Sequence, residues 1–154
     1  MKKYIFLFAF CFFLALPVFA PRIFAQTATE LETLLYTDAV NYAQAARFVL
    51  LAADAADLRA EEAFRYAMEK KWLPAAATQD APAKLDAVSL LIMQAFNMKG
   101  GAFYTLLKTT HYAYRELLYQ NVIQGRADSD MAVSGDLLLF IVNRVLDQTE
   151  GNRQ

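Results

Sequence analysis

The residues of this chain best suited to contacting a partner are aromatic and cationic, and three of them share one short stretch. Tyr112 and Tyr119 are seven residues apart, so two helical turns bring them to one face together with Arg115. Tyrosine and arginine are enriched where protein surfaces meet partners. This spacing predicts a partner-contact surface, and the simpler alternative is packing at the edge of the core.

Two further residues are candidates for the same role. Arg126 follows Gly125 in a polar loop and could meet an anion; the alternative is plain exposure to solvent. Trp72 stands at the edge of another loop, where its ring could be a platform for a sugar. Core packing is the default interpretation for Trp72, because it aligns with the apolar Val122 in a similar segment described below.

The sequence lacks the further residues that its candidate catalytic or metal-binding residues would need to form a site. His111 is the only histidine, whereas histidine metal sites and catalytic triads need more groups. Asp128 and Asp130 resemble part of a calcium loop, but Val133 and Leu139 stand where that loop requires glycine and glutamate. We therefore expect no metal, no cofactor and no enzymatic activity.

Paired carboxylates would be needed for glycoside hydrolysis, and they would have to face one cleft at a set separation. Glu61, Glu62 and Glu116 are the candidates. Solvated helix faces explain all three, so we predict no catalytic role for them.

The N-terminus predicts export. Met1-Lys2-Lys3 is a positive start, Tyr4–Ala20 is an apolar run, and Ile23-Phe24-Ala25 supplies a cleavage signal. We expect residues 1–25 to be a signal peptide, with the periplasm or cell envelope as destination; the alternative is an uncleaved N-terminal anchor.

Charge and cysteine content restrict the mature chain further. Without Lys2, Lys3 and Arg22, 12 basic residues face 16 acidic ones, which argues against a nucleic-acid binder. The single cysteine, Cys11, lies in the segment expected to be removed. The mature protein would then form no disulfide and no thiolate metal site.

Two stretches of the chain are similar. A shift of 50 positions aligns Phe64–Phe96 with Tyr114–Leu146 without a gap, and each reads as helix, apolar pair, polar loop and helix. A shift of 43 positions adds Val40–Ala53 as a partial third copy. No alternating run is long enough for a strand. We predict an all-α, pseudo-repeat helical bundle in which three apolar stripes pack together. The expected helices are 27–36, 41–54, 57–71, 84–97, 102–107, 110–120 and 134–148.

The arrangement resembles the S-layer homology (SLH) module, in which a helix, a short apolar step, an acidic loop and a capped helix recur. The most similar residues are Tyr112-Ala113-Tyr114-Arg115-Glu116-Leu117, Val122-Ile123-Gln124-Gly125 and Val133-Ser134-Gly135-Asp136. The resemblance implies three pseudo-repeats around a three-helix core, and non-catalytic anchoring to cell-wall polymer or peptidoglycan.

The chain departs from that family at the motif that contacts the polymer. The Thr-Arg-Ala-Glu position has no arginine in any copy; it reads Asn41-Tyr42-Ala43-Gln44, Lys84-Leu85-Asp86-Ala87 and Ser134-Gly135-Asp136-Leu137. The resemblance therefore supports the fold more than the binding, and we transfer no binding residue from it.

We predict one SLH-like domain over residues 26–150 and a frayed tail over 151–154. The expected function is binding of peptidoglycan or another cell-wall polymer. The alternative is a periplasmic protein-interaction or structural subunit without glycan affinity. The sequence predicts no membrane span after the signal peptide is removed, and it leaves the oligomeric state open.

Overall fold

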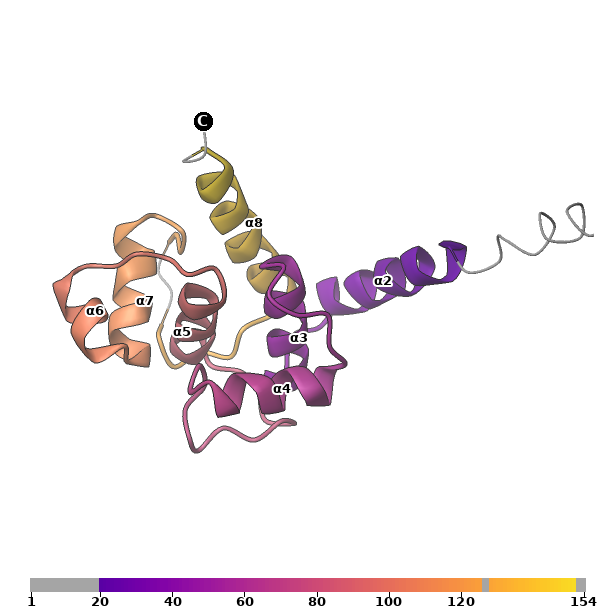
Figure 1. Cartoon of the computed structure of the whole chain (residues 1–154), viewed down its shortest axis with the longest axis horizontal. Coiled ribbons are helices and arrows are strands. Elements are labelled where there is room, and N and C mark those ends of the chain that lie inside the picture. The colour runs from indigo at the N-terminus through magenta and orange to yellow at the C-terminus, as the bar shows by residue number, and fades with distance from the viewer. Residues whose placement is uncertain (1–19, 126–127, 152–154) are drawn as a thin grey trace, which may run out of the picture. The chain divides into compact units, whose positions relative to one another are not determined.

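The computed structural model describes residues 20–125 and 128–151 (Figure 1). Over these residues the chain is helical and forms no β-strand, which confirms the all-α fold class. The chain divides into two compact units, Met1–Thr33 and Leu34–Gln154. Most of the predicted signal peptide, residues 1–19, lies outside the described residues.

The helices follow the predicted order with shifted ends. They are α2 (Ala20–Leu35), α3 (Tyr42–Ala52), α4 (Ala60–Glu69), α5 (Leu85–Ala95), α6 (Ala102–Leu107), α7 (Thr110–Tyr119) and α8 (Gly135–Gly151). Helix α8 continues past the expected end at Gln148 and includes Gly151, so the first residue of the predicted frayed tail is helical. Residues 152–154 are outside the described part.

Helix α5 is the most buried element of the larger unit. From Leu85 to Met93 every residue except Asp86 is buried, so this helix is apolar almost all round, as expected for a helix with neighbours on several sides. Ser89, the one polar residue in this set, donates its hydroxyl to the carbonyl of Leu85 at 2.6 Å. Helix α3 packs on α4, α5 and α8, and α7 packs on α5 and α6.

Three backbone segments, just before the helices α3, α5 and α8, are joined in a ring of hydrogen bonds. The amide of Ala83 donates to the carbonyl of Val40 (2.8 Å), that of Val40 to Val133 (2.8 Å), and that of Val133 to Ala83 (2.9 Å). All three residues are fully buried, and each stands two positions before the first residue of α3, α5 or α8. The ring therefore satisfies six buried backbone groups and fixes where these helices begin.

The loops next to this ring cap the N-termini of neighbouring helices. Amides in the first turn of α3 donate to the loop after α4, Tyr42 to Ala81 (3.2 Å) and Ala43 to Gln79 (3.1 Å). Amides in the first turn of α5 donate in the same way to Met131 (3.0 Å) and Ser129 (2.9 Å). These bonds supply acceptors for N–H groups that a helix cannot satisfy within itself.

Two residues after the end of each of the helices α3, α4, α5 and α7, a non-glycine residue adopts the left-handed conformation: Asp54, Lys71, Asn97 and Asn121. After α5, for example, Met98 donates to Met93 at 2.9 Å and Asn97 to Gln94 at 3.2 Å, the paired bonds of a Schellman motif. Asn97, and neither of the glycines Gly100 and Gly101 that follow it, supplies the left-handed conformation after α5. Likewise the left-handed residue after α4 is Lys71, which stands three residues before Pro74.

Candidate functional site

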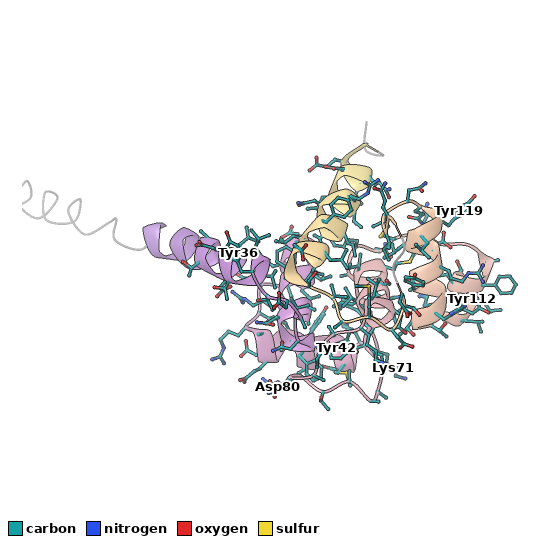
Figure 2. The ribbon with its side chains drawn as sticks, turned by 180° about the vertical axis from the view of Figure 1, so that it is seen from behind. Tyr36, Tyr42, Lys71, Asp80, Tyr112 and Tyr119 are labelled. Carbon is teal, nitrogen blue, oxygen red and sulfur yellow. The ribbon has the colours of Figure 1, made fainter. Side chains whose placement is uncertain are left out.

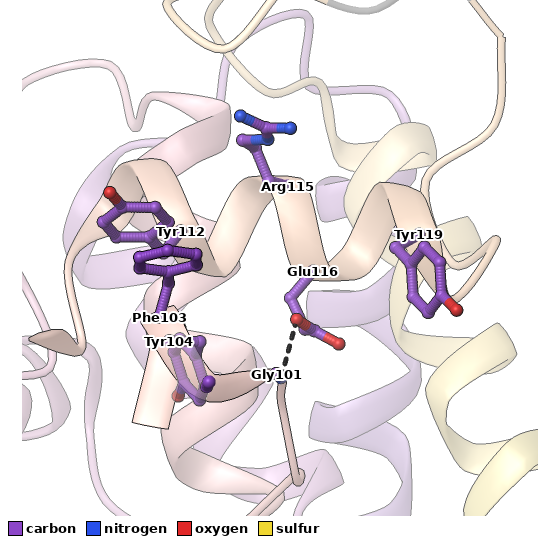
Figure 3. Close-up of a pocket in the computed structure, with 8 residues that line it drawn as sticks. Gly101, Phe103, Tyr104, Tyr112, Arg115, Glu116 and Tyr119 are labelled. Atoms are coloured by element: carbon purple, nitrogen blue, oxygen red, sulfur yellow. Dashed lines mark hydrogen bonds between the residues drawn. The ribbon is translucent and has the colours of Figure 1, made fainter. Parts of the chain in front are cut away.

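A hollow lies between α6 and α7, with a cavity volume of about 460 Å³ (Figure 3). The short connection at Lys108 and Thr109 folds α6 back against α7, with Lys108 in the left-handed conformation. The side chains that line the hollow are mostly aromatic or charged: Phe103, Tyr104, Tyr112, Arg115, Glu116 and Tyr119.

Aromatic rings form much of its surface. Phe103 and Tyr112 stack with ring centroids 5.6 Å apart and an interplanar angle of 12°. Tyr112 and Tyr119 lie at opposite ends of α7 (Figure 2). Phe103 is 67% exposed and Tyr119 is 84% exposed, so both rings offer apolar faces to a ligand.

The two charged residues of the hollow differ in what they already contact. One carboxylate oxygen of Glu116 accepts from the amide of Gly101 at 2.9 Å, and the other accepts from Gln120 Nε2 at 3.1 Å. Arg115 is exposed, and we find no ion pair or hydrogen bond of its guanidinium with any residue that the structure describes. Glu116 therefore fixes the backbone at Gly101. The guanidinium of Arg115, in contrast, is available to bind an anion.

Tyr104 joins this hollow to the core. It is 5% exposed, and its phenol oxygen accepts a hydrogen bond from Nε2 of Gln94 on α5 at 2.7 Å. Burial raises the pKa of Tyr104 above its ordinary value, an effect that the bond from Gln94 partly opposes. The phenol of Tyr104 is therefore neutral at physiological pH.

The structure unites three of the five residues predicted for a contact surface: Tyr112, Arg115 and Tyr119 all line the hollow. Trp72 does not line it; the tryptophan is partly buried, and its ring meets that of Tyr66 edge-on at 5.7 Å. This placement agrees with the default interpretation of core packing. Arg126 lies outside the described residues.

Sequence reasoning missed Phe103. The stretch 102–107 was predicted only as a short helix, and no helical spacing links it to α7 because a loop intervenes. Phe103 does precede a run of apolar residues flanked by Lys99 and Lys108. That pattern was the one available signal of an exposed apolar surface.

Three of the other residues considered for chemistry make contacts within the domain. The carboxylate of Asp130 pairs with Lys84 Nζ at 2.9 Å, and Asp128 accepts from the amide of Asp130 at 3.1 Å, which is the bonding of a turn. His111 is exposed and its ring meets that of Tyr112 edge-on at 5.3 Å. Within residues 20–125 and 128–151, no group of three or more His, Cys, Asp or Glu side chains is arranged to hold a metal ion.

In comparisons with protein-family models, curated proteins and solved structures, no match to this chain was found. Among the helices that the structure describes, none is both long enough and apolar enough to cross a membrane.

Proposed function

We propose that this chain is a non-catalytic, exported envelope protein that binds peptidoglycan or another cell-wall polymer through an SLH-like domain. The observation that carries the proposal is the hollow between α6 and α7, where exposed aromatic rings stand beside an arginine with no partner among the described residues.

The chemistry of this hollow suits an acidic saccharide. A pyranose ring has an apolar C–H face that can lie on an aromatic ring, and Phe103 and Tyr119 offer such rings. Wall polymers also carry carboxylate or phosphate groups, and the planar guanidinium of Arg115 can bind either one through two parallel hydrogen bonds. Stacking would give affinity for the ring, and the arginine would select for acidic units.

The backbone bonding supports the pseudo-repeat part of the proposal. The bonds of Tyr42 and Ala43 to Ala81 and Gln79 recur in α5 with donors shifted by 43 positions and acceptors shifted by 50. The ring members Val40, Ala83 and Val133 are related by the same two shifts. We infer that α3, α5 and α8 are the equivalent helices of three divergent copies.

The contact surface that we propose is not the arginine-bearing motif of SLH modules. The corresponding positions at the starts of α3, α5 and α8 contain no arginine. Binding through Arg115 and Tyr119 would therefore be a property of this chain rather than one carried over from the resemblance.

A sedimentation assay with purified peptidoglycan sacculi tests the proposal. We expect the wild-type protein to be retained, and Arg115→Ala or Tyr119→Ala to weaken retention by about tenfold, the effect of losing roughly 1.4 kcal/mol of binding. Arg65→Ala is the matched control, because Arg65 is exposed and is the sixth residue of α4, as Arg115 is of α7. Equal retention of all four proteins, or none, would contradict the hollow as a polymer site.

The second candidate is a protein-interaction or structural subunit without glycan affinity. The absence of arginine from all three motif positions favours it. In that case sacculi would not retain the protein, and one envelope protein would be recovered with the wild type but not with Tyr119→Ala. For either function, N-terminal sequencing of the exported protein tests cleavage: we expect Gln26 first, and an intact Met1 would indicate an anchor.

A further inference from the structure

Helix α6 has an exposed apolar face of three side chains, and the proposed polymer site involves only one of them, Phe103. Phe103 is 67% exposed, Leu106 is 80% exposed and Leu107 is 49% exposed. Their spacing of three and four residues puts them on one side of the helix. Of the six residues of α6, only Tyr104 is buried. We refer to Phe103, Leu106 and Leu107 as the α6 ridge.

The charge around this ridge has the opposite sign to that of the rest of the domain. Between Asp86 and Asp128 the sequence contains one acidic residue, Glu116, although the whole chain has more acidic than basic residues. Lys99 and Lys108 flank α6, and both are exposed. In this stretch Lys99, Lys108 and Arg115 outnumber Glu116, so its net charge is positive.

Three hydrogen bonds hold the segment that carries the ridge in position. Besides the bond from Gly101 to Glu116, the carbonyl of Lys99 accepts from Gln120 Nε2 at 2.9 Å, and Tyr104 is bonded to Gln94. These contacts join both the start and the middle of the α6 segment to α7 and α5. The apolar side chains are therefore presented to solvent by a fixed backbone, which lowers the ordering cost of binding.

We infer that the α6 ridge docks the domain on an anionic phospholipid surface. Membrane-surface segments combine apolar side chains that enter the headgroup region with lysines that meet anionic headgroups, and the ridge with Lys99 and Lys108 has both parts. The three ridge side chains carry no hydrogen-bonding group, and the hydroxyl of the neighbouring Thr105 donates to the carbonyl of Gly100. This lack of polar specificity favours a lipid surface over a protein partner.

Lipid docking would be separate from polymer binding. Leu106, Leu107, Lys99 and Lys108 do not line the hollow, which depends on Arg115 and Tyr119. The two surfaces share only Phe103. Variants at Leu106 and the two lysines therefore test the membrane proposal without altering the proposed polymer contacts.

The test uses an environment-sensitive fluorophore on the ridge, because the apolar run at the N-terminus of the full chain could itself bind vesicles. In a Cys11→Ser background, Leu106→Cys is labelled with a nitrobenzoxadiazole dye. Ala76→Cys, at an exposed loop residue after α4, is the control. Both proteins are titrated with vesicles of phosphatidylcholine alone, or of equal parts phosphatidylcholine and phosphatidylglycerol.

We expect a blue shift and brighter emission at position 106 with the anionic vesicles only, and no change at position 76. Replacing Lys99 and Lys108 with glutamine should weaken the response about fivefold for each lysine. An equal response on neutral vesicles, an equal response at position 76, or none at position 106 would overturn the inference. A blue shift that grows with protein concentration without lipid would also overturn it, because a second copy would then cover the ridge.

Discussion

Gly135, the first residue of α8, lies directly against the backbone of Leu34. A β-carbon at position 135 would be 1.6 Å from the carbonyl oxygen of Leu34 and 2.5 Å from its carbonyl carbon. The amide of Gly135 also donates to the carbonyl of Thr37 at 2.8 Å. Glycine is required here because any side chain would overlap backbone atoms, which cannot rotate aside.

We therefore expect Gly135→Ala to destabilise the domain. The segment at Leu34 or the start of α8 would have to shift, and overpacking of this kind costs about 3 kcal/mol at the upper end of its usual range. Chemical unfolding monitored by circular dichroism would measure the loss.

Gly151→Ala is the matched control, because no atom lies within 4 Å of a β-carbon at that position. It stands at the end of α8, where alanine is the better helix former, so stability should be unchanged or slightly higher. If the two variants were equally stable, the close approach of Gly135 to Leu34 would be wrong.

Asn41 and Lys84 provide a second matched pair, since each is the N-cap of a core helix. The side chain of Asn41 accepts from the amide of Gln44 at 2.8 Å, and Gln44 accepts from the amide of Asn41 at 3.0 Å. Lys84 makes no side-chain cap bond, and its pair with Asp130 is exposed.

We expect Asn41→Ala to lower the free energy of unfolding by about 1 kcal/mol, the usual cost of losing a side-chain cap. Lys84→Ala should change it by less than about half of that, because exposed ion pairs contribute little. The comparison uses thermal melts of the two variants and the wild type. A larger loss in Lys84→Ala would mean that the Lys84–Asp130 pair, and not the capping box, is the stronger support.

Tyr104 should give the domain a specific sensitivity to alkaline pH. Because burial raises its pKa in the folded protein, the folded state holds this proton more tightly than the unfolded state does. The resulting stability is complete below the unfolded tyrosine pKa of about 10 and is lost as pH rises through the folded pKa.

The variant Tyr104→Phe isolates this effect. At pH 7 we expect it to cost about 1 kcal/mol, because the bond with Gln94 is lost. Above about pH 10 the difference from the wild type should shrink or change sign, since phenylalanine has no proton to lose. Urea unfolding at both pH values measures it, and the other tyrosines are common to both proteins. A difference that stays constant with pH would refute the burial of Tyr104.

Much of the helical fold could be predicted from sequence, because apolar spacing decides which face of each helix is buried. The spacing of Val88, Leu91 and Ile92 places them on one face of the predicted helix 84–97, and all three are fully buried in α5. The helix ends were less accurate. Asn97 and Lys71 adopt the left-handed conformation, although Gly100 and Pro74 nearby are the residues usually associated with the end of a helix.

The hydrogen-bonded ring could not be predicted from the sequence, and the hollow between α6 and α7 could be predicted only in part. The ring consists of backbone hydrogen bonds between Val40, Ala83 and Val133. The identities of their side chains therefore do not predict it. Tyr112, Arg115 and Tyr119 could be grouped because they share one helix. The contribution of Phe103 depends on a reversal of the chain at Lys108, and its spacing from Tyr112 therefore follows no helical period.

Glu116 should control the position of α6 without supporting the whole domain. Its carboxylate accepts from the amide of Gly101, and it also accepts from Gln120, which bonds to the carbonyl of Lys99. We expect Glu116→Ala to lower the free energy of unfolding by only about 1 kcal/mol. Amides of 99–107 should nevertheless exchange with deuterium severalfold faster, because this segment loses its attachment to α7.

Glu69→Ala, at the exposed end of α4, is the control and should leave exchange in 99–107 unchanged. Glu116→Gln retains one acceptor oxygen, so we expect an intermediate rate. Faster exchange throughout α3 and α5 would mean that Glu116 supports the core, and an unchanged rate in 99–107 would mean that the bond to Gly101 does not hold α6. If only 99–107 loosens, weaker retention on sacculi or a weaker vesicle response in the same variant would connect the position of α6 to the binding that depends on it.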